Sequence, residues 1–183
     1  YATGFEGLII YLRDILPTTE VIDGAIRKSV PMFPELAVRE LIANALIHQD
    51  FAISGTGPML EIFEDRMEVT NPGVPLGDIQ RLLDQPPKSR NEKLAALMRR
   101  MGLCEERGSG IDKVVFETEA RQLPPPQWIA KEQDARAIIF GPKAMRQMTK
   151  DDLMRACYQH ACLLHERHET LTNTSLRERL GVE

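Results

Sequence analysis

Three polar side chains of different chemistry recur one helical turn apart within residues 36–50. They are Glu40, Asn44 and His48, and at about 100° per residue they share one narrow stripe of a helix. Apolar residues flank the stripe on both sides, whereas a solvated helix face carries several lysines and glutamates. Polar groups held among apolar neighbours need hydrogen-bond partners, which are either other side chains or a bound ligand. The pattern fits a core helix with satisfied polar residues as well as it fits a binding site.

Two later segments have the residue types of ligand-binding loops. Gly108 and Gly110 precede a predicted helix; glycines let the backbone approach a ligand, and the free N–H groups of a helix start attract phosphate. Asn71 and Gly73 enclose Pro72 at the end of a predicted hairpin, in a turn-rich loop. Each motif also occurs in proteins where it binds nothing, so neither one identifies a site alone.

The elements that must position these residues alternate between helices and short hairpins. Apolar spacing, prolines and glycines predict them as follows: a helix over 5–16, a strand over 26–30, the helix over 36–50, a hairpin of 59–63 and 67–70, a short helix over 78–83, a helix over 88–102, a helix over 111–121, a hairpin of 128–131 and 135–140, a tail helix with an apolar stripe over 153–164, and a short helix over 172–180. In the helix over 88–102 we expect Leu94, Leu97, Met98 and Met101 to face inward. Gly141 and Pro142 mark the predicted boundary between a domain over 1–142 and a helical segment over 143–183.

Composition narrows the class of protein. The 183 residues are 43% hydrophobic and 27% charged, which is ordinary for a globular domain. A net charge of −4 gives no overall footprint for nucleic acid, so DNA contacts would need a local surface or another part of a longer protein. The three scattered cysteines form no disulfide framework, and the sequence has neither a run of about 18 apolar residues nor an export signal. We expect a cytoplasmic protein that makes no membrane contact, and a chain cut from something longer because it opens at Tyr1.

Three segments in fixed order resemble a known bacterial family. They are residues 39–50, with the Glu40, Asn44 and His48 stripe, residues 65–73, and residues 106–111. Together they resemble the histidine-kinase-like (GHKL-type) ATPase domain at the C-terminal end of transcriptional regulators and RecG-related ATP-dependent DNA helicases. The resemblance covers about residues 1–140. It implies an α/β fold, a two-layer α/β sandwich of the Bergerat type with helices on one face of a mixed sheet. A DNA-binding domain usually precedes this domain in relatives, and the segment over 172–180 resembles the opening of the winged helix that often follows.

The resemblance implies a site for ATP and Mg²⁺ built on the first motif. Glu40 matches the carboxylate that orients and deprotonates the attacking water. Asn44 matches the amide that holds Mg²⁺ against the phosphates, an oxygen ligand suited to a hard cation. His48 and Asp50 extend the motif and are included among the nucleotide-binding residues, without an assigned step.

The other two motifs match the parts that enclose the nucleotide. Asn71 and Gly73 correspond to the loop that meets the adenine. Gly108 and Gly110 correspond to glycines of the lid over the triphosphate, with Arg107 beside them.

The sequence also departs from the pattern of the ATP-binding fold. That fold normally has Asp where Asn71 stands; Asn can accept the same hydrogen bond through its carbonyl, but its amide end could equally favour another base or none. The second glycine of that loop is absent, and Glu92 stands where the narrower family has proline. The charge of the phosphates would rely on backbone N–H groups, Arg107 or Lys113. These departures bear more on turnover than on the fold.

Two other clusters of polar residues favour ordinary structural roles. Residues 157–168 include cysteines and histidines, but on a continuous helix Cys157 and His168 lie roughly 16 Å apart, which disfavours a zinc site. Lys88, Arg90 and Lys93, followed by Arg99 and Arg100, make a locally basic helix of the kind that usually forms a solvated face.

The favoured interpretation is an ATP- and Mg²⁺-binding regulatory domain of a bacterial DNA-associated transcriptional regulator. DNA would be contacted through flanking domains, and weak ATPase activity and a homodimer are both compatible with the sequence. The phosphate-binding motif of helicase motors, Gly-x-x-x-x-Gly-Lys-Ser/Thr, is absent from the chain, so motor activity is not supported. The main alternative is a degenerate, non-hydrolysing scaffold or dimerisation module between DNA-binding domains. A third, direct DNA binding, predicts retention on duplex DNA that weakens steeply with salt.

Overall fold

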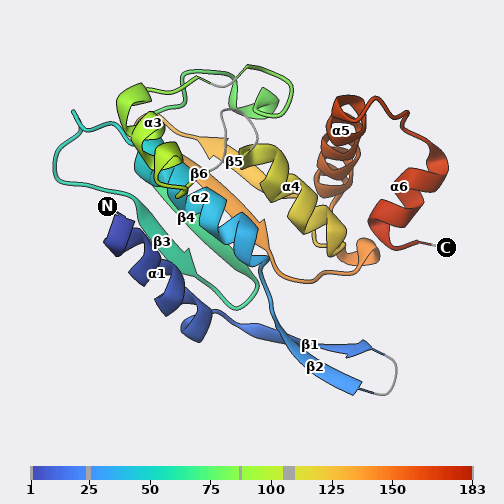
Figure 1. Ribbon diagram of the computed structural model, residues 1–183. Coiled ribbons are helices and arrows are strands. Elements are labelled where there is room, and N and C mark those ends of the chain that lie inside the picture. The colour runs from blue at the N-terminus through green and yellow to red at the C-terminus, as the bar shows by residue number, and fades with distance from the viewer. Residues whose placement is uncertain (1, 24–25, 87, 105–109, 183) are drawn as a thin grey trace.

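The computed structural model describes residues 2–23, 26–86, 88–104 and 110–182. Its elements agree closely with the predicted series of helices and hairpins (Figure 1). They are α1 (Ala2–Ile15), β1 (Thr18–Asp23), β2 (Ile26–Pro31), α2 (Glu35–His48), β3 (Met59–Ile62), β4 (Arg66–Pro72), the 3-10 helix η1 (Ile79–Arg81), α3 (Glu92–Arg100), α4 (Gly110–Ala120), β5 (Gln127–Ala130), β6 (Asp134–Phe140), the 3-10 helix η2 (Met145–Gln147), α5 (Lys150–Glu166) and α6 (Asn173–Leu180).

A four-stranded sheet in the order β3-β4-β6-β5 forms the base of the fold. Strands β4 and β6 pair along seven residues at its centre, from Arg66 opposite Phe140 to Pro72 opposite Asp134. Every neighbouring pair in this sheet is antiparallel, so the expected mixed sheet is not found in the described residues. The outer strands each reach the centre through a short hairpin, which only an antiparallel pair permits.

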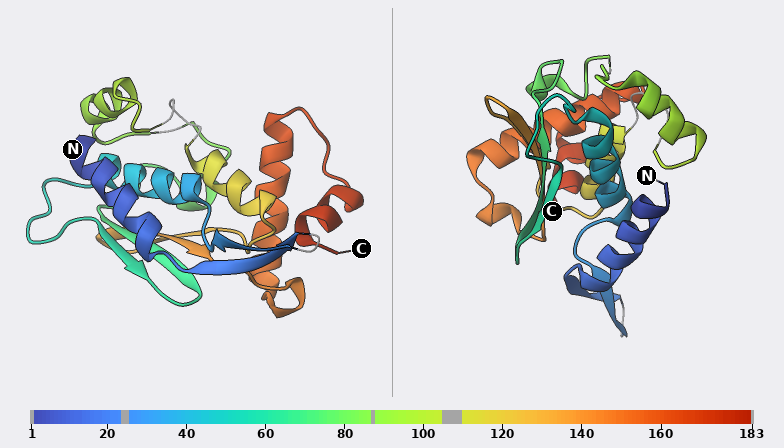
Figure 2. Two further views of the ribbon diagram at one scale, coloured as in Figure 1. Left: turned by 60° about the horizontal axis from the view of Figure 1, so that its bottom comes forward. Right: turned by 90° about the vertical axis from the view of Figure 1, so that its left-hand side faces the viewer.

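Helices α2 and α4 pack against each other on one face of the sheet, and α1 lies on the same side (Figure 2). The sheet contributes Met67, Val69 and Ile139 to the core, and all three are buried beneath the helices. Burial of side chains of this size stabilises the fold by about 1.5–3 kcal/mol each. On β4 the alternate residue Glu68 is also buried, where it forms ion pairs with Arg66 and Arg136.

Helix α2 is a core helix with a polar stripe. It begins after Pro34 and ends before Gln49, whose backbone is extended. Most of its apolar residues are buried, including Ala37 and Ala43, which have no exposed area. Because the helix is covered on most sides, the residues of its polar stripe are shielded from bulk water, and Asn44 and His48 are only partly exposed. Glu40 on the stripe is only 2% exposed.

The C-terminal helices pack on the rest of the chain. Leu163 of α5 meets Val115 of α4 and Leu83 in a small buried cluster. Helix α6 has the predicted caps: the Thr172 side chain accepts a hydrogen bond from the Ser175 backbone N–H, and Gly181 ends the helix with φ +64°. The winged helix that this segment was expected to open stays a prediction. Within the described residues every helix is too short or too polar to cross a lipid bilayer.

One local prediction was wrong in part. Leu97 and Met101 of the α3 segment are exposed, whereas Met98 is buried as predicted and Ala95 is buried as well. The strand predicted over 26–30 is confirmed as β2, and β1, which was not predicted, pairs with it along its whole length. This hairpin projects from the end of the molecule away from the larger sheet (Figures 1 and 2).

Candidate nucleotide-binding site

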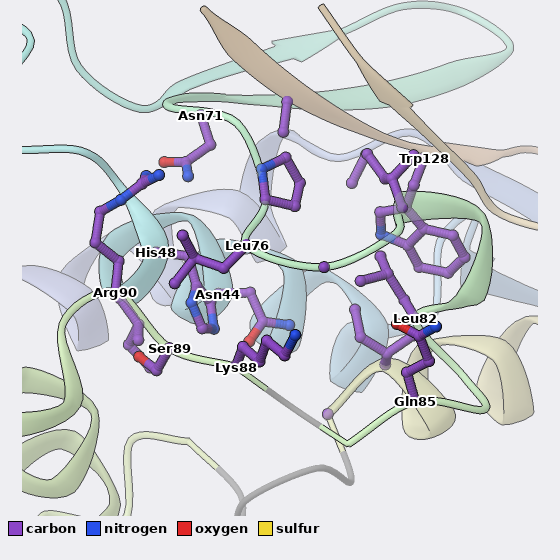
Figure 3. Close-up of a pocket in the computed structure, with 18 of the residues that line it drawn as sticks. Asn44, His48, Asn71, Leu76, Leu82, Gln85, Lys88, Ser89, Arg90 and Trp128 are labelled. Carbon is purple, nitrogen blue, oxygen red and sulfur yellow. The ribbon is translucent and has the colours of Figure 1, made fainter.

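A cavity of about 840 Å³ opens between α2, the loop after β4 and the start of α4 (Figure 3). Its volume lies within the range of small-molecule sites. Residues from all three sequence motifs line it: Glu40, Asn44 and His48 from α2, Asn71 and Gly73 from the end of β4, and Gly110 from α4. The three segments that resembled one family therefore meet at one cavity, although they are separated by tens of residues in the sequence.

The start of α4 lies directly against the polar stripe of α2. A Cβ atom built on Gly110 would lie 2.9 Å from Glu40 Oε2 and 3.5 Å from Asn44 Nδ2. A residue without a side chain at this position leaves the ends of Glu40 and Asn44 facing the first backbone N–H groups of α4. Such N–H groups have no partner inside the helix and attract anions.

Three buried polar atoms of the cavity lining meet no hydrogen-bond partner in the described part of the chain. These open polar atoms are Asn44 Nδ2, Asn71 Oδ1 and Ser89 Oγ. A buried polar atom left without a partner costs about 1–3 kcal/mol, so folded proteins retain few of them. Three such atoms around one cavity are what a site for a polar ligand requires.

The loop after β4 is held in place by Asp50, the last residue of the first motif, and by Arg90. Gly73 has φ +101°, and a Cβ atom there would lie 2.7 Å from the Asp50 Cβ. The Asp50 backbone N–H donates to Pro72 O at 2.8 Å, and Arg90 Nη2 donates to Val74 O at 3.0 Å. Arg90 and Asp50 also form an ion pair at 3.6 Å. Asp50 thus supports the loop from behind and is not one of the residues that line the cavity.

Burial is the main cause of a shifted pKa at two residues that line the cavity. Burial lowers the pKa of His48, and the positive charge of Arg90 lowers it further, so the imidazole is neutral at pH 7. Burial also raises the pKa of Asp112 to about 6, and the nearby Glu166 carboxylate adds to this shift. Asp112 lies in the first turn of α4, two residues after Gly110.

Sequence reasoning missed the segment over 88–90, which lines the cavity next to the end of α2. Lys88, Ser89 and Arg90 all line it, although the basic residues were assigned to a solvated face. Asn91 brings them there, because its Nδ2 donates at 2.8 Å to both Ile47 O and Gln49 O at the end of α2. Its acceptors lie 44 and 42 residues earlier, so no local pattern reveals them. Trp128 of β5 also lines the cavity and was not predicted.

Arg107 and Gly108, the remaining residues of the predicted lid, lie outside the described residues. The same holds for residues 105, 106 and 109.

Comparison with known proteins supports the interpretation of the motifs. Residues 55–139 match the family described as "Putative ATP-dependent DNA helicase recG C-terminal". The resemblance predicted from the sequence is confirmed over this segment. The RecG C-terminal match includes Asn71, Gly73 and Gly110 but begins after α2, so the roles of Glu40 and Asn44 rest on the motif and on the cavity.

A solved structure shows the same fold. The DIP2311 protein from Corynebacterium diphtheriae, a structural genomics target, is similar over 98% of this chain with a TM-score of 0.70. The two sequences are 22% identical, so the likeness concerns the fold alone. This chain spans 39% of the length of that protein. A comparison with curated proteins gave no match.

Proposed function

We propose that the cavity binds ATP together with Mg²⁺, and that the chain is a regulatory domain of a DNA-associated transcriptional regulator. One observation carries the proposal: Asn44 presents an open polar atom beside Gly110, at the start of a helix, in a cavity large enough for a nucleotide. The adenine would lie toward Asn71 and Gly73. The triphosphate would lie between Asn44 and the first turn of α4.

The residues around Asn44 fit a magnesium ion. A carboxamide and a carboxylate are oxygen ligands of the kind that Mg²⁺ takes beside phosphate oxygens. Rotation of the Asn44 amide by half a turn exchanges its nitrogen and oxygen, and this orientation depends on the hydrogen bonds available. Asn44 would hold the ion, which would neutralise charge on the phosphates.

Glu40 is the residue that would act on water. Its carboxylate lies beside Asn44 and next to Gly110, and it is almost fully buried. A carboxylate held close to a bound water orients it and accepts its proton. At the other end of the cavity, Asn71 Oδ1 is an open acceptor that suits the amino group of adenine.

Calorimetric titration with ATP and Mg²⁺ tests the proposal. We expect the unaltered protein to bind, Asn44→Ala to bind at least tenfold more weakly, and Glu40→Ala to bind while losing turnover. Asn173→Ala in the exposed part of α6 removes an amide outside the cavity and should match the unaltered protein. Absence of heat at ligand concentrations up to about 1 mM, the range of very weak binding, overturns the proposal.

A scaffold or dimerisation module is the second candidate. Asn71 in place of the usual Asp and the missing second glycine favour it, because both weaken recognition of adenine. A protein that gives no heat with ATP yet sediments as a dimer would support this alternative. In either case we propose that DNA is contacted by flanking domains, and that residues 172–180 open a winged helix in a cytoplasmic protein.

A further inference from the structure

The cavity needs positive charge if it holds a triphosphate. The residues of the first turn of α4 that line it are Gly110, Ile111 and Asp112, and none of them has a basic side chain. Four basic residues among those described line the cavity: Arg81, Lys88, Arg90 and Arg99. Arg81 is paired with Asp84, and Arg90 is held by Asp50 and by Val74 O. Lys88 and Arg99 are the two for which the described residues provide no ion pair.

Lys88 is followed by a second donor that faces the same space. Ser89 Oγ is one of the open polar atoms defined above, and it lines the cavity with Lys88. Asn91 anchors this segment to the end of α2, which fixes where Lys88 and Ser89 enter. Figure 3 shows Lys88 and Ser89 among the side chains that line the cavity.

We propose that Lys88 and Ser89 form the phosphate-binding segment of this cavity. The inference rests on the proposed nucleotide binding and identifies the residues that recognise the phosphates. The ammonium group of Lys88 and the hydroxyl of Ser89 are both hydrogen-bond donors, and donors around one space select an anion. The segment provides the cation that the sequence places only at Arg107 or Lys113 near the lid.

Carboxylates that line the cavity explain why a cation is needed there. Glu40, Glu92 and Asp112 all line it, and their negative charge would repel phosphates in the absence of a nearby cation. Arg99, near the end of α3, also lines the cavity, but unlike Lys88 it has no adjacent open hydroxyl.

Paired titrations with ATP–Mg²⁺ and adenosine test the inference on the intact chain. We expect Lys88→Ala to weaken ATP binding about tenfold to a hundredfold, the range for hydrogen bonds to charged groups, and to change adenosine binding less than about twofold. Ser89→Ala should weaken ATP binding about fivefold, and Lys88→Arg should restore most of it. Lys93→Ala, which removes an exposed lysine of α3 that does not line the cavity, should leave ATP affinity within about twofold.

The outcomes separate this inference from the proposed function. If the unaltered protein binds ATP and Lys88→Ala binds it equally well, the nucleotide site stands and the phosphate assignment is wrong. Equal losses of ATP and adenosine affinity in Lys88→Ala show a structural role and also overturn it. If the unaltered protein binds neither ligand, the proposed function fails and the inference fails with it. Thermal unfolding of each variant checks that a loss of affinity is not a loss of fold.

Discussion

The side chain of Asn44 has opposite effects on folding and on the proposed binding. Its Nδ2 is an open polar atom in the folded protein, and that cost is removed only when a ligand supplies an acceptor. A site of this kind trades stability of the free protein for affinity. The same reasoning applies to Asn71 and Ser89, which hold the other two open atoms.

We therefore expect Asn44→Leu to stabilise the free protein. Leucine has a similar size and removes the amide that lacks a partner, so the free energy of unfolding should rise by about 1 kcal/mol. Urea denaturation without ligand measures it, with Asn173→Leu as the exposed control. A clear loss of stability in Asn44→Leu would show that the amide is satisfied in the folded protein by a group outside the described residues.

The raised pKa of Asp112 makes the free energy of unfolding depend on pH. Its pKa is about 6 in the folded protein and near 3.8 in an unfolded chain. Between these values the folded protein keeps a proton that the unfolded chain releases, so the free energy of unfolding falls as the pH rises from about 4 to 6. The loss of stability that comes from ionising Asp112 in the folded protein is complete above about pH 6 and absent below about pH 4.

Asp112→Asn should remove this penalty. We expect the variant to exceed the unaltered protein in stability by about 1 kcal/mol at pH 7, less than the full shift implies because the carboxyl group is partly exposed. The two proteins should unfold alike at pH 4. Urea titrations at the two pH values measure the difference, and Asp151→Asn in the exposed first turn of α5 is the control. Equal stability of Asp112→Asn and the unaltered protein at pH 7 would contradict the raised pKa.

At the scale of the elements, the loop after β4 depends on a glycine. Gly73 combines φ +101° with close contact to Asp50, so a side chain there meets both backbone strain and a collision. Gly55 has φ +79° but nothing within 4 Å of an added Cβ atom. Comparison of an alanine substitution at Gly73 with one at Gly55 therefore separates the cost of backbone strain from the cost of the collision.

Gly73→Ala should lower the free energy of unfolding by roughly 2–4 kcal/mol, whereas Gly55→Ala should lower it by about 1 kcal/mol. The first variant should also displace Asn71 from the cavity and weaken nucleotide binding. Chemical denaturation and calorimetry measure the two effects. If both variants lose the same free energy of unfolding, Asp50 moves away from the new side chain without cost. Backbone strain then accounts for the whole loss in Gly73→Ala.

Elements with a local pattern were predictable, and those fixed by distant contacts were not. Helix α2 has its polar stripe at a spacing of one turn, so both the helix and three residues of the cavity followed from the sequence. Strand β1 begins with the polar residues Thr18, Thr19 and Glu20. Its pairing with β2 keeps it extended. The placement of Lys88 depends on the bonds from Asn91 to the end of α2, which no local spacing encodes.

At the scale of the whole molecule, α4 connects the cavity to the C-terminal helices. Gly110 at its first residue faces Glu40, and Glu119 near its other end contacts α5 and α6. The Glu119 carboxylate meets His160 Nδ1 at 2.6 Å and Arg179 Nε at 3.2 Å. A shift of α4 on nucleotide binding would therefore be transmitted to α6, the segment that we expect to open the winged helix. The predicted boundary at residue 142 would then separate two parts that α4 couples.

Arg179 makes this connection testable because its charge is buried. Its side chain is nearly inaccessible, and burial lowers the pKa of its guanidinium while Glu119 opposes that shift. Removal of one partner of a buried ion pair leaves the other charge uncompensated, so Glu119→Gln should lower the free energy of unfolding by about 3 kcal/mol. The double variant Glu119→Leu with Arg179→Leu should recover most of that loss, and Glu117→Gln on the same helix should have little effect.

Urea unfolding followed by circular dichroism measures the stability of all three variants, and one cooperative transition is expected in each. A separate early transition in Glu119→Gln, with the main transition unchanged, would show instead that α5 and α6 unfold independently of the domain that holds the cavity.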